Sequence, residues 1–294
     1  MKLVVLTGFL GAGKTTILNR VLAAAGGRRL AVIVNDLGKV NIDKALLQAS
    51  AGDMVELAGG CVCCTVDVNR DLWQTLPDIV ARARPEMVIL ETTGAAEPGP
   101  LVAGARERGY RPLVACAVDA SSPAGLGYPE AEAQADGADG ILLTKLDLAR
   151  ADDALATHRR LDELGARAPR VSFPVGRERA LTAWLCDELR SAGRPPRPAR
   201  TTQLAAVSVI GDDAFLAEPL AKLLERFGDD VLRVKGFVRL AGDARRAWVE
   251  KAGRRIEIAR DAAAPGRTEM VLIGPGLDEA AVLRQVWACA AGRQ

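Results

Sequence analysis

The chain has 294 residues, of which 49% are hydrophobic and 26% are charged, and this balance is typical of a globular protein with about two domains. Its 39 Lys and Arg residues against 37 Asp and Glu residues give a formal net charge of only +2, which excludes an overall polycation. No uninterrupted apolar segment reaches the ~18 residues that a membrane span needs, so no membrane partner is expected.

The first predicted element is a buried strand over Leu3–Thr7, and a glycine-rich loop with the sequence GFLGAGKTT follows it. The loop fits the pattern G-x-x-x-x-G-K-[ST], and a helix-forming segment from Ile17 to Ala23 comes directly after it. Glycines let the backbone turn tightly, so that amide N–H groups and the helix N-terminus converge on an anion. This stretch therefore predicts a nucleotide-phosphate site formed by Gly8, Gly11, Ala12, Gly13, Lys14, Thr15 and Thr16.

Lys14 and Thr15 carry the chemistry of this loop. Lys14 supplies a mobile positive charge for the β and γ oxygens of the nucleotide, and the hydroxyl of Thr15 is placed to ligate Mg²⁺. Because the apolar start runs straight into this loop, cleavage of a signal peptide would destroy the site, and we expect a cytoplasmic protein. In that compartment the six cysteines are expected to be thiols.

Predicted strands and helices then alternate as far as residue 192. The further strands are expected at Arg29–Val34, Val55–Leu57, Met87–Leu90, Leu113–Asp119, Gly140–Leu143 and Arg170–Phe173. Helices are expected at Val68–Arg84, at Asp152–Leu164 and in a segment that ends near Leu189. This alternation predicts an α/β fold of the P-loop NTPase type, with a doubly wound, mostly parallel sheet that binds ligands at its carboxyl edge.

Three of the six cysteines lie within four residues, at Cys61, Cys63 and Cys64. Three thiolates in a loop that follows two glycines suit a soft cation, with the fourth position left to a carboxylate, water or a partner. A vicinal disulfide between Cys63 and Cys64 is the alternative, and it would be strained. Cys116, Cys186 and Cys289 lie in apolar strand or helix segments and are interpreted as core residues.

Glu91 follows the buried strand Met87–Leu90, and Gly94 comes three residues later. In a nucleotide-hydrolysing fold this position places a carboxylate near Mg²⁺ and a glycine amide near the γ-phosphate. Glu91 and Gly94 therefore join Lys14 and Thr15 as the predicted catalytic residues.

The tetrapeptide Thr144-Lys145-Leu146-Asp147 follows another buried strand and predicts the base. The carboxylate of Asp147 can accept from N1–H and from the exocyclic amine of guanine, whereas adenine would leave it unpaired. Lys145 can lay its aliphatic stem along the base. A solvated Lys and Asp after a strand is the competing interpretation. We predict that Thr144, Lys145 and Asp147 bind guanine, so that the nucleotide is GTP.

A second, smaller α+β domain is expected after a linker rich in Pro and Arg. The predicted boundaries are 1–192 for the nucleotide domain, 193–203 for the linker and 204–294 for the second domain, with an antiparallel sheet. Residues 231–260 of the second domain hold nine Lys and Arg against three Asp and Glu. Solvated strand faces are the preferred interpretation, and docking to an acidic client is the other. No nucleic-acid partner is expected, because only Phe237 and Trp248 interleave with the basic residues.

These motifs together resemble the CobW-type metallochaperone GTPases, relatives of the nickel-inserting GTPases of urease and hydrogenase maturation. The resemblance rests on GFLGAGKTT, VNDLG at Val34–Gly38, GGCVCC at Gly59–Cys64, ETTGAAEP at Glu91–Pro98, TKLD at Thr144–Asp147 and RTEMVLIGPGLDE at Arg267–Glu279. It implies GTP hydrolysis coupled to the binding of a transition metal, most often zinc and in some members cobalt, and to its delivery to a client metalloprotein or metalloenzyme complex. A homodimer is compatible with it. In this family an acidic residue after the second strand helps the cysteines hold the metal, and Asp36 occupies that place.

Three positions depart from the family pattern. Asp36 stands where members usually have Glu, Lys39 stands where they have an acidic residue, and Thr144 stands where GTPases commonly have Asn. The first two bear on metal affinity and the third on nucleotide affinity. Two alternative functions also follow from the motifs: a thiol-based metal or redox sensor that uses Cys63 and Cys64, and a regulatory GTPase with a structural metal.

Overall fold

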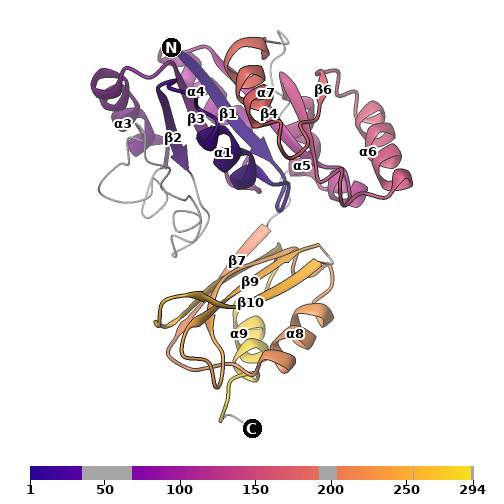
Figure 1. The fold of residues 1–294 in the computed structure, drawn as a ribbon. Helices are drawn as coiled ribbons and strands as arrows, with labels where there is room; N and C mark the ends of the chain where they lie inside the picture. Colours follow the sequence, from indigo (N-terminus) through magenta and orange to yellow (C-terminus); the bar gives the residue numbers. More distant parts are fainter. Residues whose placement is uncertain (35–67, 192–203, 254, 293–294) are drawn as a thin grey trace. The chain divides into compact units, whose positions relative to one another are not determined.

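A computed structural model of the chain describes residues 1–34, 68–191, 204–253 and 255–292. These residues form two compact units, with 1–34 and 68–191 in the first and 204–253 and 255–292 in the second (Figure 1). Several predicted features lie outside the described residues, namely Asp36, Lys39, the strand at 55–57, Cys61, Cys63, Cys64 and the linker at 193–203.

The first unit is built on a six-stranded sheet in the order β2-β3-β1-β4-β5-β6, and every pairing is parallel. The strands are β1 (Lys2–Gly8), β2 (Leu30–Val34), β3 (Met87–Glu91), β4 (Pro112–Asp119), β5 (Gly140–Thr144) and β6 (Arg170–Val171). The order brings the carboxyl ends of β1 and β3 next to each other. The prediction of a mostly parallel α/β sheet is confirmed.

Helices cover both faces of this sheet (Figure 1). The helices are α1 (Lys14–Ala23), α3 (Val68–Ala83), α4 (Pro98–Glu107), α5 (Pro129–Asp136), α6 (Ala151–Glu163) and α7 (Glu178–Ala183). Apolar side chains of α1 and α7 pack on one face, and those of α3, α4, α5 and α6 pack on the other. Strands buried on both faces read as continuous apolar runs, which explains why the sequence pattern located them.

Two helices of the first unit were not among the predictions. α4 contains Pro98, Gly99 and Pro100, and α5 begins directly at Pro129. Proline at the first positions of a helix lacks only an N–H that would be unpaired there, so it starts these helices instead of excluding them. A 3₁₀ turn at Pro123–Gly127 comes before α5. The helix expected to end near Leu189 continues from α7 as a single π turn, Trp184–Glu188.

The second unit contains a five-stranded antiparallel sheet in the order β10-β9-β8-β11-β7. Its elements are β7 (Leu204–Gly211), α8 (Ala217–Arg226), β8 (Arg233–Arg239), β9 (Arg246–Ala252), β10 (Arg255–Ala263), β11 (Thr268–Pro275) and α9 (Glu279–Trp287). Leucines of α8 and valines of α9 share one core with alternate residues of the strands, such as Val207 and Val209. The predicted α+β architecture is confirmed.

The basic run in this second unit is not simply a solvated strand face. Lys251 is 2% exposed, and its ammonium donates hydrogen bonds of 2.6–2.8 Å to the carbonyl oxygens of Gly228, Val231 and Gly253. Burial lowers the pKa of Lys251. Lys235 is also buried, and its ammonium lies 5.8 Å from the ring centroid of Trp248. These two lysines are part of the internal structure of the domain.

No helix in the described parts of the chain is long and apolar enough to cross a bilayer.

Candidate functional site

The predicted phosphate loop lies between β1 and α1, and its glycines adopt backbone conformations that other residues rarely adopt. Gly8, Gly11 and Gly13 have φ values of +145°, +78° and +88°. A Cβ on Gly8 would lie 2.4 Å from the carbonyl oxygen of Ala117 in the neighbouring strand β4. Glycine is therefore required at position 8 both for its conformation and for this close approach.

Lys14 opens α1 and turns its ammonium back onto the loop. Its Nζ donates hydrogen bonds to the carbonyl oxygens of Gly8, at 2.7 Å, and Phe9, at 3.4 Å, and the residue is 5% exposed. The loop itself thus supplies acceptors for the charge. Ala12 is buried within the loop, whereas Thr16 is exposed in the first turn of the helix.

Thr15 and Glu91 meet at the carboxyl edge of the sheet. The Thr15 hydroxyl donates a hydrogen bond of 3.1 Å to Oε1 of Glu91, which is 4% exposed. Glu91 is held there because it ends β3, where it pairs with Leu6 of β1 on one side and with Val34 of β2 on the other. A hydroxyl and a carboxylate are hard oxygen ligands of the kind that Mg²⁺ prefers, so this pair fits the predicted magnesium site.

The segment after Glu91 lies against the phosphate loop. A Cβ on Gly94 would lie 2.8 Å from the backbone nitrogen and the Cα of Leu10. Two residues earlier, the buried hydroxyl of Thr92 donates to that of Thr7 at 3.1 Å, and the Thr92 amide donates to the Leu6 carbonyl at 3.0 Å. Only glycine allows this approach at position 94. The segment after Glu91 and the phosphate loop, which hold the predicted catalytic residues, therefore contact each other through their backbones.

Gln134 of α5 holds the segment that follows Glu91 through two hydrogen bonds. The sequence did not identify this residue. Its side chain is fully buried, and Nε2 donates to the carbonyl oxygens of Gly94, at 3.2 Å, and Ala96, at 2.9 Å. Both partners are acceptors, which fixes the orientation of the amide. The Tyr128 ring, just before α5, stacks on Phe9 of the phosphate loop at 4.8 Å between centroids. Thus α5 and the residue before it contact both segments.

The predicted base loop is tied to the phosphate loop through Thr144. The Thr144 hydroxyl lies 2.9 Å from the carbonyl oxygen of Ala12 and 3.1 Å from that of Val118, and its one proton can serve either acceptor. A short hydroxyl at this position therefore connects the two loops from the end of β5.

Lys145 forms an ion pair that the sequence analysis did not propose. Its Nζ lies 2.6 Å from Oδ2 of Asp119 at the end of β4, and Oδ1 of Asp119 accepts from the amide and the hydroxyl of Ser121. The Lys145 backbone has a φ of +55°, which starts the turn that leaves Asp147 exposed. The pair fixes the far end of the lysine, and with it the course of the aliphatic stem.

The described residues contain no group of three or more His, Cys, Asp or Glu side chains that could hold a metal. Cys116, Cys186 and Cys289 are free thiols in buried or half-buried positions, as predicted for core residues. Burial raises the pKa of the Cys116 thiol from 9.0 to about 12. The predicted ligands Asp36, Cys61, Cys63 and Cys64 lie outside the described residues.

Asp119 and Gln134 are the residues that sequence reasoning missed. A signal existed for Asp119, because it ends a predicted strand at the same sheet edge as Glu91 and Thr144. For Gln134 the sequence offers no comparable signal, since its partners lie 38 and 40 residues away in the chain.

Comparisons with known proteins find relatives that match both units of the chain. Residues 2–172 match the model of the CobW/HypB/UreG nucleotide-binding domain, and residues 204–290 match the cobalamin synthesis protein cobW C-terminal domain. The chain is 32% identical to the zinc chaperone CobW of Pseudomonas aeruginosa, over 96% of this chain and 89% of that protein. It is 28% identical to the zinc chaperone CobW of a Sinorhizobium species, over 97% and 96% of the two chains.

Among solved structures, the chain is similar to the Zn(II)-bound YjiA GTPase from E. coli, with 25% identity, 98% of both chains covered and a TM-score of 0.45. The match to the family model spans more than half of the sequence and includes every described residue of the phosphate and base loops. The chain belongs to the CobW/HypB/UreG family, with a CobW C-terminal domain after its nucleotide-binding domain.

Proposed function

We propose that this protein is a GTP-hydrolysing metallochaperone that binds zinc and hands it to a client metalloprotein under the control of the bound nucleotide. Family membership supports nucleotide binding, and the relatives named zinc chaperones support the cargo. The roles of the individual residues are part of the proposal.

GTP binding and hydrolysis use the two loops at the carboxyl edge of the sheet. The amides of the phosphate loop bind the phosphates, and Lys14 exchanges its carbonyl acceptors for phosphate oxygens at little cost, because its ammonium is already aimed at the loop. Thr15 and Glu91 would hold Mg²⁺, whose charge neutralises the oxygens on which negative charge develops. The Gly94 amide is the donor expected near the γ-phosphate.

Selection of guanine uses the exposed carboxylate of Asp147. The ion pair between Lys145 and Asp119 keeps the lysine stem in place beside the base. Thr144 contributes by holding the base loop to Ala12 and not by a contact with the base itself. The Thr144 hydroxyl therefore helps to fix the position of a base bound at Asp147 relative to phosphates bound at the phosphate loop.

The metal site is proposed from the sequence, with Cys61, Cys63 and Cys64 as thiolate ligands and Asp36 as the fourth. This donor set accepts zinc in tetrahedral geometry and also accepts Co²⁺. The zinc is the cargo of the protein, so a site that can release it is required.

One observation carries the coupling between nucleotide and metal. Val34, the last residue of β2, is the strand partner of Glu91, and Asp36 follows it by only two residues in the chain. The segment with all four proposed metal ligands thus follows, in the chain, a strand whose last residue pairs with Glu91, and the Thr15 hydroxyl contacts the Glu91 carboxylate. A change at the γ-phosphate acts on Glu91 and Gly94, and from there it reaches the start of the metal segment.

The experiment that tests this function is metal analysis of protein purified anaerobically, with and without a non-hydrolysable GTP analogue. We expect about one zinc per chain with the analogue and less zinc after exchange to GDP. An equal zinc content that exchanges slowly in every nucleotide state would instead identify a structural metal. Reversible oxidation of Cys63 and Cys64 without metal release would identify a thiol-based sensor.

A further inference from the structure

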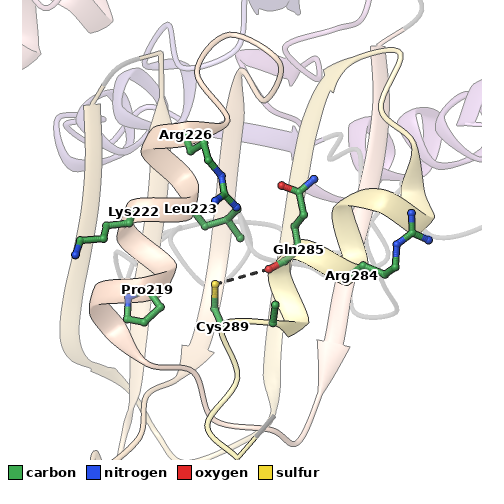
Figure 2. A pocket seen from close by; sticks show the side chains of 8 residues that line it. Pro219, Lys222, Leu223, Arg226, Arg284, Gln285 and Cys289 are labelled. Atoms are coloured by element: carbon green, nitrogen blue, oxygen red, sulfur yellow. Dashed lines mark hydrogen bonds between the residues drawn. The ribbon is translucent and has the colours of Figure 1, made fainter. Parts of the chain in front are cut away.

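A groove in the second unit has a charge pattern that the nucleotide and metal sites do not explain. It lies between α8 and α9, has a volume of about 460 Å³ and opens to solvent (Figure 2). Its apolar surface includes Pro219 and Leu223 of α8 and Ala288 after α9. Its charged residues are all basic, namely Lys222, Arg226 and Arg284.

The three cations are spread along the groove and do not converge on one point. Figure 2 shows Arg226 reaching from α8 toward α9, while Lys222 and Arg284 extend outward on opposite sides. Lys222 and Arg226 are four residues apart on one helix face, about 6 Å along the axis. A single phosphate would need convergent donors, whereas this spacing suits carboxylates that repeat along a chain.

The charge of the groove is only partly neutralised within the protein. Lys222 pairs with Glu218 at 2.6 Å in an exposed contact, which is weak in water. Within the described part of the chain, neither Arg226 nor Arg284 forms an ion pair, and no carboxylate lines the groove. The groove therefore presents positive charge around an apolar floor.

We propose that the groove between α8 and α9 docks an acidic, partly apolar peptide segment of the client protein. Carboxylates of the segment would pair with Arg226 and Arg284, and an apolar side chain between them would lie on Leu223 and Ala288. Arginine suits this role because its planar group binds carboxylates with two parallel hydrogen bonds. The identity of the partner as a metal client rests on the proposed function, whereas binding of an acidic peptide does not.

The test uses the full chain and a fluorescein-labelled peptide in which Glu and Leu alternate, followed by anisotropy. The acidic peptide should bind, and a peptide with Lys in place of every Glu should not. The variant Arg226→Glu/Arg284→Glu should weaken binding at least about tenfold. The matched control Arg245→Glu/Arg255→Glu changes the net charge equally at exposed positions outside the groove and should change the affinity less than about twofold.

Three results would overturn the proposal. They are failure of the acidic peptide to bind, equal weakening by the groove variant and its control, and displacement of the peptide by single-stranded RNA or phosphatidylserine vesicles. The variant Arg226→Gln/Arg284→Gln removes the two positive charges without reversing them, in case the charge-reversed variant misfolds. Circular dichroism shows whether each variant is folded. The groove variant should retain the zinc and GTP affinities of the parent. If the protein binds the peptide but its zinc affinity is the same with GDP and with a GTP analogue, the proposed function is contradicted. The assignment of the groove as a peptide site is then still supported.

Discussion

The Thr15 hydroxyl donates a 3.1 Å hydrogen bond to the Glu91 carboxylate and so joins the first helix to the end of β3. The two residues are 76 positions apart in the chain, and parallel pairing of β1 with β3 brings them together. This contact connects the phosphate loop to β3, which pairs with β2, the strand that comes just before the proposed metal segment in the chain.

The first prediction concerns hydrolysis. The parent should hydrolyse GTP slowly, on the order of 10⁻⁴ to 10⁻² s⁻¹, because no glutamine or arginine finger is evident from the sequence. Lys14→Ala and Thr15→Val should each lower this rate at least about a hundredfold. The first removes the positive charge that faces the phosphate oxygens, and the second removes a ligand for Mg²⁺. Phosphate release under single-turnover conditions measures the rate. Thr182→Val, which removes a hydroxyl bonded within α7, is the matched control and should retain the parental rate.

The second prediction concerns the base. GTP should bind much more tightly than ATP, and Asp147→Asn should shift the preference toward xanthine nucleotides, whose C2 oxygen needs a donor in place of the carboxylate. Competition against a fluorescent GDP derivative gives the affinities. Asp152→Asn, at an exposed position of α6, is the control. Equal affinities of the parent for ATP and GTP would refute the guanine assignment.

The third prediction concerns Gln134 as a positioning residue. Gln134→Met keeps the approximate volume but removes both hydrogen bonds to the carbonyls of Gly94 and Ala96. Because Gly94 is expected near the γ-phosphate, affinity for a GTP analogue should fall about tenfold while affinity for GDP stays within about twofold. A merely structural role would lower both affinities together. Gln74→Met, on the exposed side of α3, is the control, and melting temperatures of both variants report their folding.

The fourth prediction is a pH dependence from Cys116. Burial raises the pKa of this thiol to about 12, so the native state keeps its proton above pH 9 while the unfolded state loses it. The unfolded state then binds fewer protons, and the free energy of unfolding falls as pH rises through this window. The Cys116 contribution to this fall should be about 2 kcal/mol between pH 8 and pH 10.5. Urea denaturation of Cys116→Val should show a correspondingly shallower loss, and an identical slope in parent and variant would contradict the assignment.

The sequence predicted the central strands of the first unit well because they are buried on both faces and therefore mostly apolar, whereas β6 (Arg170–Val171) is only partly buried and is shorter than the predicted strand. The phosphate-loop motif was recognisable from its fixed spacing of glycines and lysine between a strand and a helix, whereas the assignment of the base loop to guanine stays a prediction. Their contacts with each other, such as Thr144 with Ala12, depend on which strands are neighbours, and spacing alone does not encode that order.

The helices α4 and α5 escaped prediction for a local reason. Both open with proline, and α5 is only eight residues long with apolar side chains limited to alanine. Packing against the sheet, through Ala131 and Ala135, stabilises α5 where intrinsic propensity and amphipathicity give a weak signal. Gln134 escaped with it, because a buried glutamine is recognisable only from the carbonyls that it meets.

The central claim is that GTP and zinc bind cooperatively, and a competition titration tests it most directly. Zn²⁺ and Co²⁺ are titrated against a chromophoric chelator in the presence of Mg·GDP or a Mg·GTP analogue, with the parent, with Cys61→Ser/Cys63→Ser/Cys64→Ser, and with Cys186→Ser as the control. Zinc affinity of the parent and the control should be at least about fivefold higher with the GTP analogue, and zinc should raise the affinity for the analogue by the same factor. Binding should also weaken as pH falls, because the thiols must lose their protons. Equal zinc affinity in the two nucleotide states, or parental affinity in the triple variant, would contradict the account.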